Sequence, residues 1–299
     1  MMQKFTAILF FIVLMNFSIS AQTIDVPYRI FDAGGDATTI EQIIDRIGIS
    51  DVIFLGENHD DATAHAIQLE IFKRAVEKYS AQRTVALSLE MFERDVQIVL
   101  DEYRRDLITE KKFLDDSRPW GNYKTDYRPL VELAKAQKLD IIAANAPRRY
   151  VNMVSRSGRD ALNQLSPEAK KWLAPLPYGE PSKTYGDKFN ALMGNMPEAN
   201  AGLNKILASQ SLWDATMAFS ISEYLKKTKT PLVIHLNGAF HTESRLGTVE
   251  HLLKYRPKTR VLVITMRYED EFTKFDKDKH TGLGDFVILT DAKVPRSQR

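Results

Sequence analysis

The 299-residue sequence contains no cysteine, and this absence excludes several kinds of site. Disulfide bonds, thiolate-bound metal centres and a lipid attached to an N-terminal thiol all require that residue. Stability must therefore come from a hydrophobic core. A chain of this length can bury a large core, either as one domain or as a domain with a substantial insertion.

The sequence also lacks an excess of charge of either sign. Its 41 Lys and Arg residues balance 39 Asp and Glu residues, which gives a formal net charge of +2. Strong attraction to nucleic acid or to an anionic membrane surface is therefore not expected. A local cluster of basic side chains remains compatible with this balance.

Long apolar runs are scarce, and the longest stretch runs from Phe5 to Phe17, between Lys4 and small or polar residues. This pattern is typical of a secretory signal peptide, and it is shorter than the roughly 20 residues that span a bilayer. We predict a signal peptide over residues 1–21, cleaved after Ala21 or, alternatively, one residue earlier. The mature chain is then expected to be periplasmic or secreted, with no transmembrane segment and no thiol-linked lipid anchor.

Six short β-branched runs have the length and composition of buried strands. They are Asp51–Leu55, Thr84–Leu89, Asp140–Ala144, Pro231–Leu236, Arg260–Thr265 and Phe286–Leu289. Segments with helical periodicity alternate with them, which indicates βαβ units and a mostly parallel sheet flanked by helices. The predicted fold class is α/β.

The third and fourth of these runs are separated by far more chain than one crossover helix needs. We therefore predict an inserted helical subdomain, or lid, at about residues 147–229 of an α/β domain that covers 22–299. Its middle part, 174–201, is rich in proline, glycine and aromatic residues. We expect that part to be a poorly helical loop.

Polar side chains follow several predicted strands, and open parallel sheets bind ligands beyond the carboxyl ends of their strands. Two strand ends carry the same Gly-x-x-His pattern, Gly56 to His59 and Gly238 to His241. Glycine lets the backbone turn sharply or approach a ligand there, and the histidine then points into the crevice. We predict a ligand crevice at this edge. The alternative is that each histidine is a turn residue ahead of a helix.

Glu57 and Glu90 lie at the ends of buried strands, where an ionised carboxylate needs a partner. Arg148 or Arg149 is expected to supply it, and a purely structural ion pair is the alternative. Asp214 lies on the apolar stripe of a helix and also needs a donor, which we expect to be an arginine from a strand end.

The other histidines are expected to have structural roles. His65 is one and a half helical turns from His59, which is not the i+4 spacing of a metal pair, so we expect it to orient the crevice. His235 is expected in the core. His251 and His280 are expected at the surface.

Taken together, these motifs resemble a known family. They are Leu55–Asp60 with His65 and Gln68, Glu90–Asp95, Trp120–Leu130, Asn145–Arg148, Asp214–Ala218 and Gly238–His241. Their order, over about residues 52–263, is similar to that in the ChaN-like haem-binding uptake proteins of the wider Tiki and erythromycin-esterase superfamily. The resemblance implies a parallel sheet with flanking helices and a helical subdomain.

For the ligand, the resemblance implies haem in a pocket that homodimerisation completes, in a haem or iron acquisition system with its receptor or transporter. In the family a tyrosine binds the iron, and a histidine and a lysine of the partner subunit hold the propionates. A flat apolar macrocycle with anionic groups also suits aromatic walls and cations. The predicted haem-binding set is Glu57, His59, Glu90, Arg148, Tyr150, Tyr178, Tyr185 and His241, and its three tyrosines are the candidates for the iron.

A second hypothesis is a peptide or ester hydrolase, because superfamily relatives use such histidines with a glutamate. His59, Glu90 and His241 then bind a divalent metal or act in general-base catalysis. The sequence has no Gly-x-Ser-x-Gly elbow and no His-Glu-x-x-His pair, so the common serine and zinc hydrolases lack support. A non-enzymatic haem-binding protein is the preferred hypothesis. A scaffold without a ligand leaves the polar strand ends unexplained.

Overall fold

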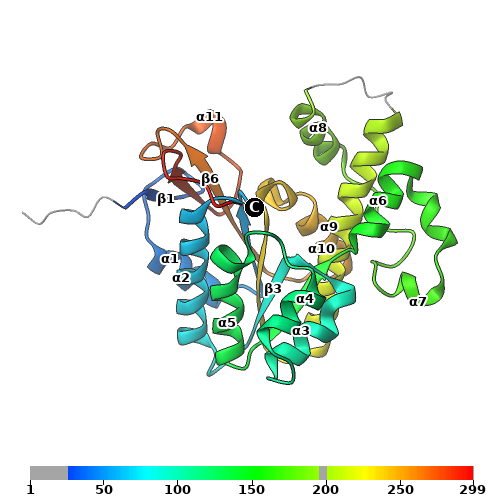
Figure 1. Cartoon of the computed structure of the whole chain (residues 1–299). Coiled ribbons are helices and arrows are strands. Elements are labelled where there is room, and N and C mark those ends of the chain that lie inside the picture. The colour runs from blue at the N-terminus through cyan, green and yellow to red at the C-terminus, as the bar shows by residue number, and fades with distance from the viewer. Residues whose placement is uncertain (1–25, 195–200, 299) are drawn as a thin grey trace, which may run out of the picture.

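A seven-stranded sheet forms the centre of the computed structural model, which describes residues 26–194 and 201–298 (Figure 1). The strands are β1 (Tyr28–Asp32), β2 (Val52–Glu57), β3 (Thr84–Glu93), β4 (Asp140–Asn145), β5 (Pro231–Gly238), β6 (Val261–Glu269) and β7 (Phe286–Asp291). Their order is β1-β7-β6-β2-β5-β3-β4, and every neighbouring pair is parallel except β1 and β7. The α/β class and the mostly parallel sheet are confirmed, and β1 adds an edge strand that the six runs do not predict.

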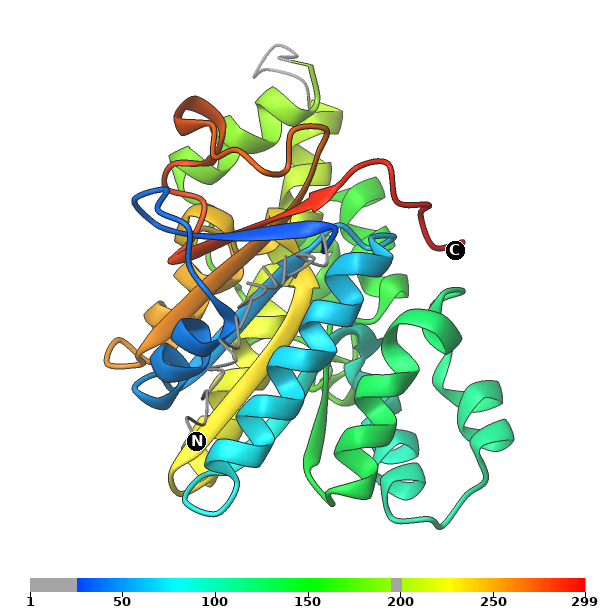
Figure 2. The ribbon, with the colours of Figure 1, turned by 90° about the vertical axis from the view of Figure 1, so that its left-hand side faces the viewer.

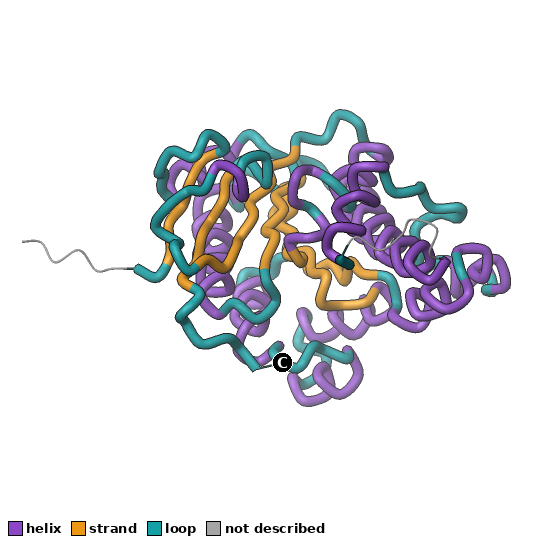
Figure 3. Tube along the Cα trace, turned by 90° about the horizontal axis from the view of Figure 1, so that it is seen from above, coloured by secondary structure: helices purple, strands orange, loops and turns teal. Residues whose placement is uncertain are grey.

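Helices lie on both faces of this sheet (Figure 3). They are α1 (Ile40–Gly48), α2 (Ala62–Tyr79), α3 (Gln97–Arg104), α4 (Glu110–Ser117), α5 (Arg128–Ala136), α6 (Arg148–Ser157), α7 (Pro167–Lys170), α8 (Lys183–Leu192), α9 (Ala201–Lys227), α10 (Thr248–Tyr255) and α11 (Lys277–His280). Short helical turns are η1 (Arg94–Val96), η2 (Tyr123–Tyr127), η3 (Arg159–Gln164), η4 (Ala239–His241) and η5 (Glu243–Arg245).

Alternation along each strand divides the core into two layers. In β2, Ile53 and Leu55 pack in the layer that contains α1, α2 and α5, whereas Val52 and Phe54 pack in the layer of α9 and α10. Figure 2 shows the long helix α2 of the first layer lying along the strands of the sheet. Because successive side chains point to opposite faces and both faces are covered, the central strands are continuous apolar runs.

The connection from β4 to β5 contains helices and no strand within its described residues, 146–194 and 201–230. Its last helix, α9, serves two layers. Met217 and Ile221 in its second half pack on the sheet, while Ala208 and Leu212 in its first half pack with residues of α6. The segment predicted as an inserted subdomain therefore shares its longest helix with the layer that covers the sheet.

The expectation of a poorly helical loop over 174–201 is wrong for α8. Ser182 caps this helix by accepting a hydrogen bond from the backbone N–H of Tyr185, which offsets the helix-weakening effect of Gly186. Residues 195–200 lie outside the described part of the chain, as does the predicted signal peptide at 1–21. Among the described helices, none combines the length and hydrophobicity needed to cross a membrane.

Two histidines are not where the sequence analysis expects them. His251 and His280 are each only 3% exposed, so their expected surface position is wrong. Gly179 makes room for His251, because a Cβ at that glycine would lie 3.0 Å from the imidazole Cε1. His280 accepts a hydrogen bond from the backbone N–H of Asp276. His235 is buried in the core as expected.

Candidate functional site

The parallel pairing of β2 with β5 brings the two Gly-x-x-His segments together. Gly56 pairs with Asn237 and Glu57 with Gly238, so both strands end at the same level. A Cβ added to Gly56 would lie only 3.0 Å from the Cα of Ala239. The first glycine therefore permits the close approach of η4 to the end of β2.

Gly238 is the point where the two histidines meet. A Cβ added there would lie 2.7 Å from Nε2 of His59 and 3.7 Å from Cδ2 of His241. Its backbone N–H donates to Oε2 of Glu90 at 2.7 Å. The φ of Gly238 is −59°, which any residue adopts, so space rather than a sharp turn explains this glycine. We call the edge formed by Glu57, His59, Glu90, Gly238 and His241 the strand-end crevice.

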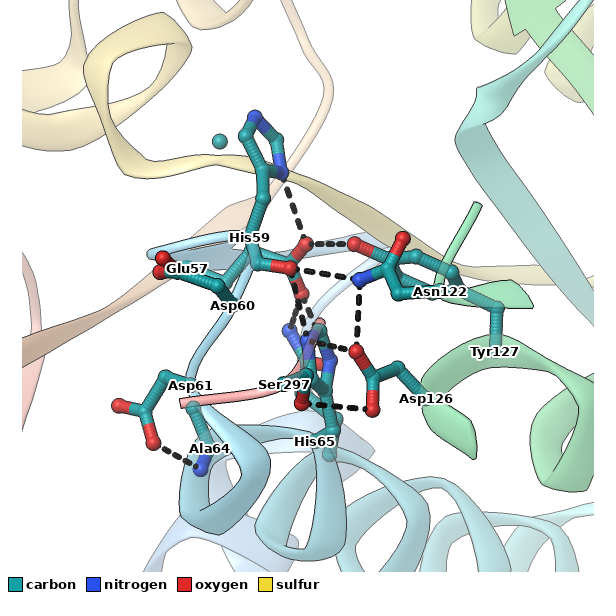
Figure 4. A network of polar contacts seen from close by, with 12 residues as sticks. Glu57, His59, Asp60, Asp61, Ala64, His65, Asn122, Asp126, Tyr127 and Ser297 are labelled. Atoms are coloured by element: carbon teal, nitrogen blue, oxygen red, sulfur yellow. Dashed lines mark hydrogen bonds and ion pairs between the residues drawn. The ribbon is translucent and has the colours of Figure 1, made fainter. Parts of the chain in front are cut away.

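Glu57 is buried and accepts hydrogen bonds from three side chains, of which Figure 4 labels His59 and Tyr127. The Tyr127 hydroxyl and the Gln68 amide each donate at 2.6 Å, and Nδ1 of His59 lies 2.9 Å from Oε1. Nδ1 of His65 lies 3.3 Å from the other carboxylate oxygen. Glu57 thereby fixes the orientation of His59, whose side chain is 22% exposed.

Glu57 and His65 form a buried ion pair. Burial opposes ionisation of the carboxyl, but the positive charge on His65 and the contact with His59 outweigh it and lower the pKa of Glu57 to about 2. Burial likewise opposes the charge on His65, and Glu57 and Asp126 outweigh it, raising the pKa of His65 to about 9. His65 is thus a buried cation at neutral pH. Only an orienting role is expected for it from the sequence, which does not predict this charge.

The segment around η2 supports this network from the other side (Figure 4). The Asn122 amide donates to Oδ2 of Asp126 at 2.6 Å and to the His59 carbonyl at 2.8 Å. The Ser297 hydroxyl, close to the C-terminus, donates to Oδ1 of Asp126 at 2.9 Å. The Trp120 ring meets the His59 imidazole edge-on, with centroids 4.8 Å apart. This segment is among the family motifs found in the sequence, but its residue types alone do not predict that it contacts His59.

His241 repeats the arrangement of His59 in a more buried setting. Its Nδ1 lies 2.9 Å from Oδ1 of Asp214, and its Nε2 lies 3.9 Å from Oε1 of Glu90. Burial opposes the charge, yet Asp214 and then Glu90 raise the pKa of His241 to about 9. Asp214 also accepts from Thr248 at 2.8 Å and from the Tyr185 hydroxyl. The expected arginine donor for Asp214 is therefore wrong.

The arginines after β4 do not reach the buried glutamates, contrary to expectation. Nε of Arg148 lies 4.0 Å from Glu93, and Arg149 pairs with Asp95. For Glu57 the reason is topological, because β4 is the edge strand and both β3 and β5 separate it from β2. Glu57 instead takes its partners from α2 and η2, and Glu90 from the backbone of β5.

The three candidate tyrosines differ in what their hydroxyls contact. Those of Tyr178 and Tyr185 are buried and donate to the Ala208 carbonyl, at 2.8 Å, and to Asp214. Burial raises the pKa of both, which disfavours their phenolate forms. Tyr150 is half-buried near the start of α6, with the Arg149 guanidinium 4.4 Å from its ring centre.

A pocket of about 720 Å³ opens beside the strand-end crevice, a volume typical of small-molecule sites. It is lined by Glu93, Arg118, Pro119, Trp120, Gly121, Asn122, Arg148 and Arg149. We call it the arginine pocket, and its Trp120 side chain also contacts the imidazole of His59. In residues 26–194 and 201–298, no group of three or more His, Asp or Glu side chains is arranged to hold a metal ion.

Replacing Gly238 with Ala should displace the His59 ring, because the new methyl group overlaps its Nε2. We expect the His59–Glu57 hydrogen bond to break and the free energy of unfolding to fall by about 1–2 kcal/mol. Histidine-selective NMR and urea unfolding measure the two effects. Gly186→Ala is the matched control, because its methyl would meet only an ordinary contact 3.7 Å away on Leu207. A His59 signal unchanged in Gly238→Ala would contradict the packing described.

Stability should fall in alkaline solution. The folded pKa of His65 is about 9, above its unfolded value, so its contribution is complete below about pH 6.5 and is lost as the pH rises through 9. Urea unfolding of the wild type should show a loss on the order of 1–3 kcal/mol between pH 6.5 and 9. His65→Gln should be less stable at pH 6.5 and lose less over this interval. Equal losses in the two proteins would rule out the buried ion pair.

Comparison with known proteins identifies the family. Residues 43–252 match the family described as haem-binding uptake, Tiki superfamily, ChaN. A structure of ChaN from Campylobacter jejuni with cofacially bound haem aligns with a TM-score of 0.68 and 21% identity, over 88% of this chain and 97% of that one. A Bacillus cereus protein aligns with a TM-score of 0.49 and 11% identity, over 87% and 93%. No curated protein gives a significant match. Because the family match spans most of the sequence, this chain belongs to the ChaN family of haem-binding uptake proteins.

Proposed function

We propose that this protein binds haem at the strand-end crevice and serves haem or iron acquisition. The observation that carries the proposal is the convergence of His59 and His241 on Gly238, beside a pocket of about 720 Å³ with an indole wall. Membership of a haem-binding uptake family supports the choice of ligand. Haem would supply an iron centre and two propionates, and the protein's task is to hold them.

The donor set at this edge fits that ligand. A porphyrin needs flat apolar walls, an iron ligand and cations for its carboxylates. Trp120 offers an aromatic face, and Arg118, Arg148 and Arg149 line the pocket beside it. His241 is protonated at neutral pH, because its pKa is about 9, and the carboxylate of Asp214 balances its charge.

Tyr150 is the residue that we propose as the iron ligand. The hydroxyls of Tyr178 and Tyr185 already donate to buried acceptors, and freeing either would leave a buried group unpaired. Tyr150 is half-buried and packs against the same cluster as Trp213, whose ring lies edge-on to His241 at 6.2 Å. Its position next to Arg148 and Arg149, which line the arginine pocket, favours it over the two buried tyrosines.

The segment at about 147–229 is proposed as the lid of this site. Lys188 of α8 donates to the Phe240 carbonyl at 2.7 Å, and Tyr185 of the same helix contacts Asp214. Helix α8 therefore adjoins η4, which carries His241. Movement of α8 would change access to the crevice from that side.

The proposal also includes export of the protein, its dimerisation and the transfer of haem to a receptor or transporter. We propose that residues 1–21 direct export to the periplasm or the medium, that two copies form a homodimer around haem, and that a receptor or transporter takes it up. N-terminal sequencing of the exported chain should begin at Gln22. Light scattering with and without haemin tests the dimer.

Hydrolysis is the second candidate, and one observation favours it. Both His59 and His241 place a carboxylate on Nδ1, which leaves Nε2 as a candidate base in the manner of hydrolytic dyads. Against it, a protonated His241 has no lone pair at neutral pH to accept a proton or bind a metal. Ester or peptide hydrolysis lost in both His59→Ala and Glu90→Ala, in a protein without a haem spectrum, would establish this alternative.

Tyr150→Phe should remove the phenolate-to-iron charge-transfer band of the haem complex and weaken haemin affinity by about tenfold or more. Absorbance titration of purified protein measures both. Tyr178→Phe is the matched control, because it deletes a hydroxyl that already donates to Ala208. It should keep the haem spectrum and lose about 1 kcal/mol of unfolding free energy.

The two failures of this test are distinct. A charge-transfer band retained in Tyr150→Phe but lost in one of the other tyrosine variants would transfer the ligand role to that residue. Wild-type protein that shows no saturable haemin absorbance would overturn the proposed function itself.

A further inference from the structure

The arginine pocket is built by three separate segments of the chain. Glu93 ends β3, Arg118 and Trp120 lie between α4 and η2, and Arg148 and Arg149 begin α6. Two residues of its lining, Trp120 and Asn122, contact His59 directly, so this volume adjoins the strand-end crevice. The charges of the pocket then decide which part of a ligand it accepts.

Two of the three arginines are held by carboxylates of the protein. Arg118 donates to Oδ1 of Asp95 at 2.6 Å and to Oε2 of Glu93 at 3.0 Å. Arg149 pairs with the other oxygen of Asp95. These pairs fix the two guanidinium groups at the pocket wall, and the group as a whole has one more cation than carboxylate.

Arg148, the third arginine, donates no hydrogen bond to these carboxylates. Its side chain is 66% exposed, and the 4.0 Å between its Nε and Oε1 of Glu93 is longer than a hydrogen bond. Its guanidinium carbon lies 5.7 Å from the centre of the Trp120 ring. This distance is within the range of a cation–π contact, which leaves the N–H groups of the guanidinium able to donate to a ligand.

The start of α6 adds to the positive potential. Arg148 and Arg149 are the first residues of this ten-residue helix, and its N-cap, Pro147, provides no side-chain hydrogen bond. The positive end of the helix dipole therefore faces the same volume as the arginines. Planar guanidinium recognises a carboxylate through two parallel hydrogen bonds, and an aromatic wall accepts the flat part of the same ligand.

We infer that the arginine pocket is a carboxylate subsite in which Arg148, supported by Arg118 and Arg149, binds a propionate of the haem. This inference rests on the proposed function and deepens it. It assigns one propionate to residues of the same chain that forms the crevice. Recognition of that carboxylate is then independent of dimer formation.

The test compares haemin with its dimethyl ester, in which both propionates lose their charge. Wild-type protein should bind haemin more tightly than the ester. Arg148→Gln should weaken haemin binding by about tenfold to a hundredfold, leave ester binding unchanged and so reduce the preference for haemin by the same factor. Arg148→Lys should recover part of the loss, because it restores the charge without the paired donors.

Arg156→Gln is the matched control, because it removes an exposed arginine from the same helix outside the pocket. It should bind both porphyrins as the wild type does. Circular dichroism and urea unfolding verify that each variant is folded, which the exposure of Arg148 favours.

Three results would overturn the inference. They are equal wild-type affinity for haemin and its ester, the same haemin affinity in the Arg148 and Arg156 variants, or a parallel loss of both porphyrins in Arg148→Gln. Wild-type protein that binds neither porphyrin would overturn the proposed function, and the subsite with it. The first three results leave haem binding intact, so the two failures are distinguishable.

Discussion

The buried carboxylate of Glu57 is the constraint on which the site depends. An ionised carboxylate without water needs partners on both oxygens, and here Tyr127, Gln68, His65 and His59 provide them. These partners come from α2, η2 and the loop after β2, so satisfying one charge fixes the arrangement of three segments. The orientation of the partly exposed His59 ring is therefore set by its bond to Glu57.

The second half of the site, around His241, also contains a buried carboxylate, Asp214, that is paired by residues of other elements. Asp214 on α9 holds His241 as Glu57 holds His59, but Asp214 draws on Tyr185 of α8 and Thr248 of α10. The halves meet at Gly238, where the absence of a side chain leaves room for the His59 ring beside His241. The first half is held by α2 and η2, and the second by α8, α9 and α10, so the position of His241 is coupled to that of α8 through Asp214 and Tyr185.

The positions of the strands follow from the sequence because a strand buried on both faces is a continuous apolar run, as Val52–Leu55 illustrates. Parallel strands end at one edge, so the convergence of the two Gly-x-x-His segments is also predictable. The strand order is not apparent from those runs, and it separates Arg148 from the buried Glu57. Likewise, nothing local to His251 indicates that Gly179, far along the chain, will make room for it.

The last described residues of the chain also belong to this region. Ser297 donates from its hydroxyl to Asp126 and from its backbone N–H to the Asp60 carbonyl, and the Arg296 guanidinium lies 4.3 Å from the centre of the Tyr268 ring. The tail therefore lies against the loop that carries His59. An affinity tag fused directly after residue 299 would therefore begin within a few residues of the network around Asp126 and could disturb the loop that carries His59.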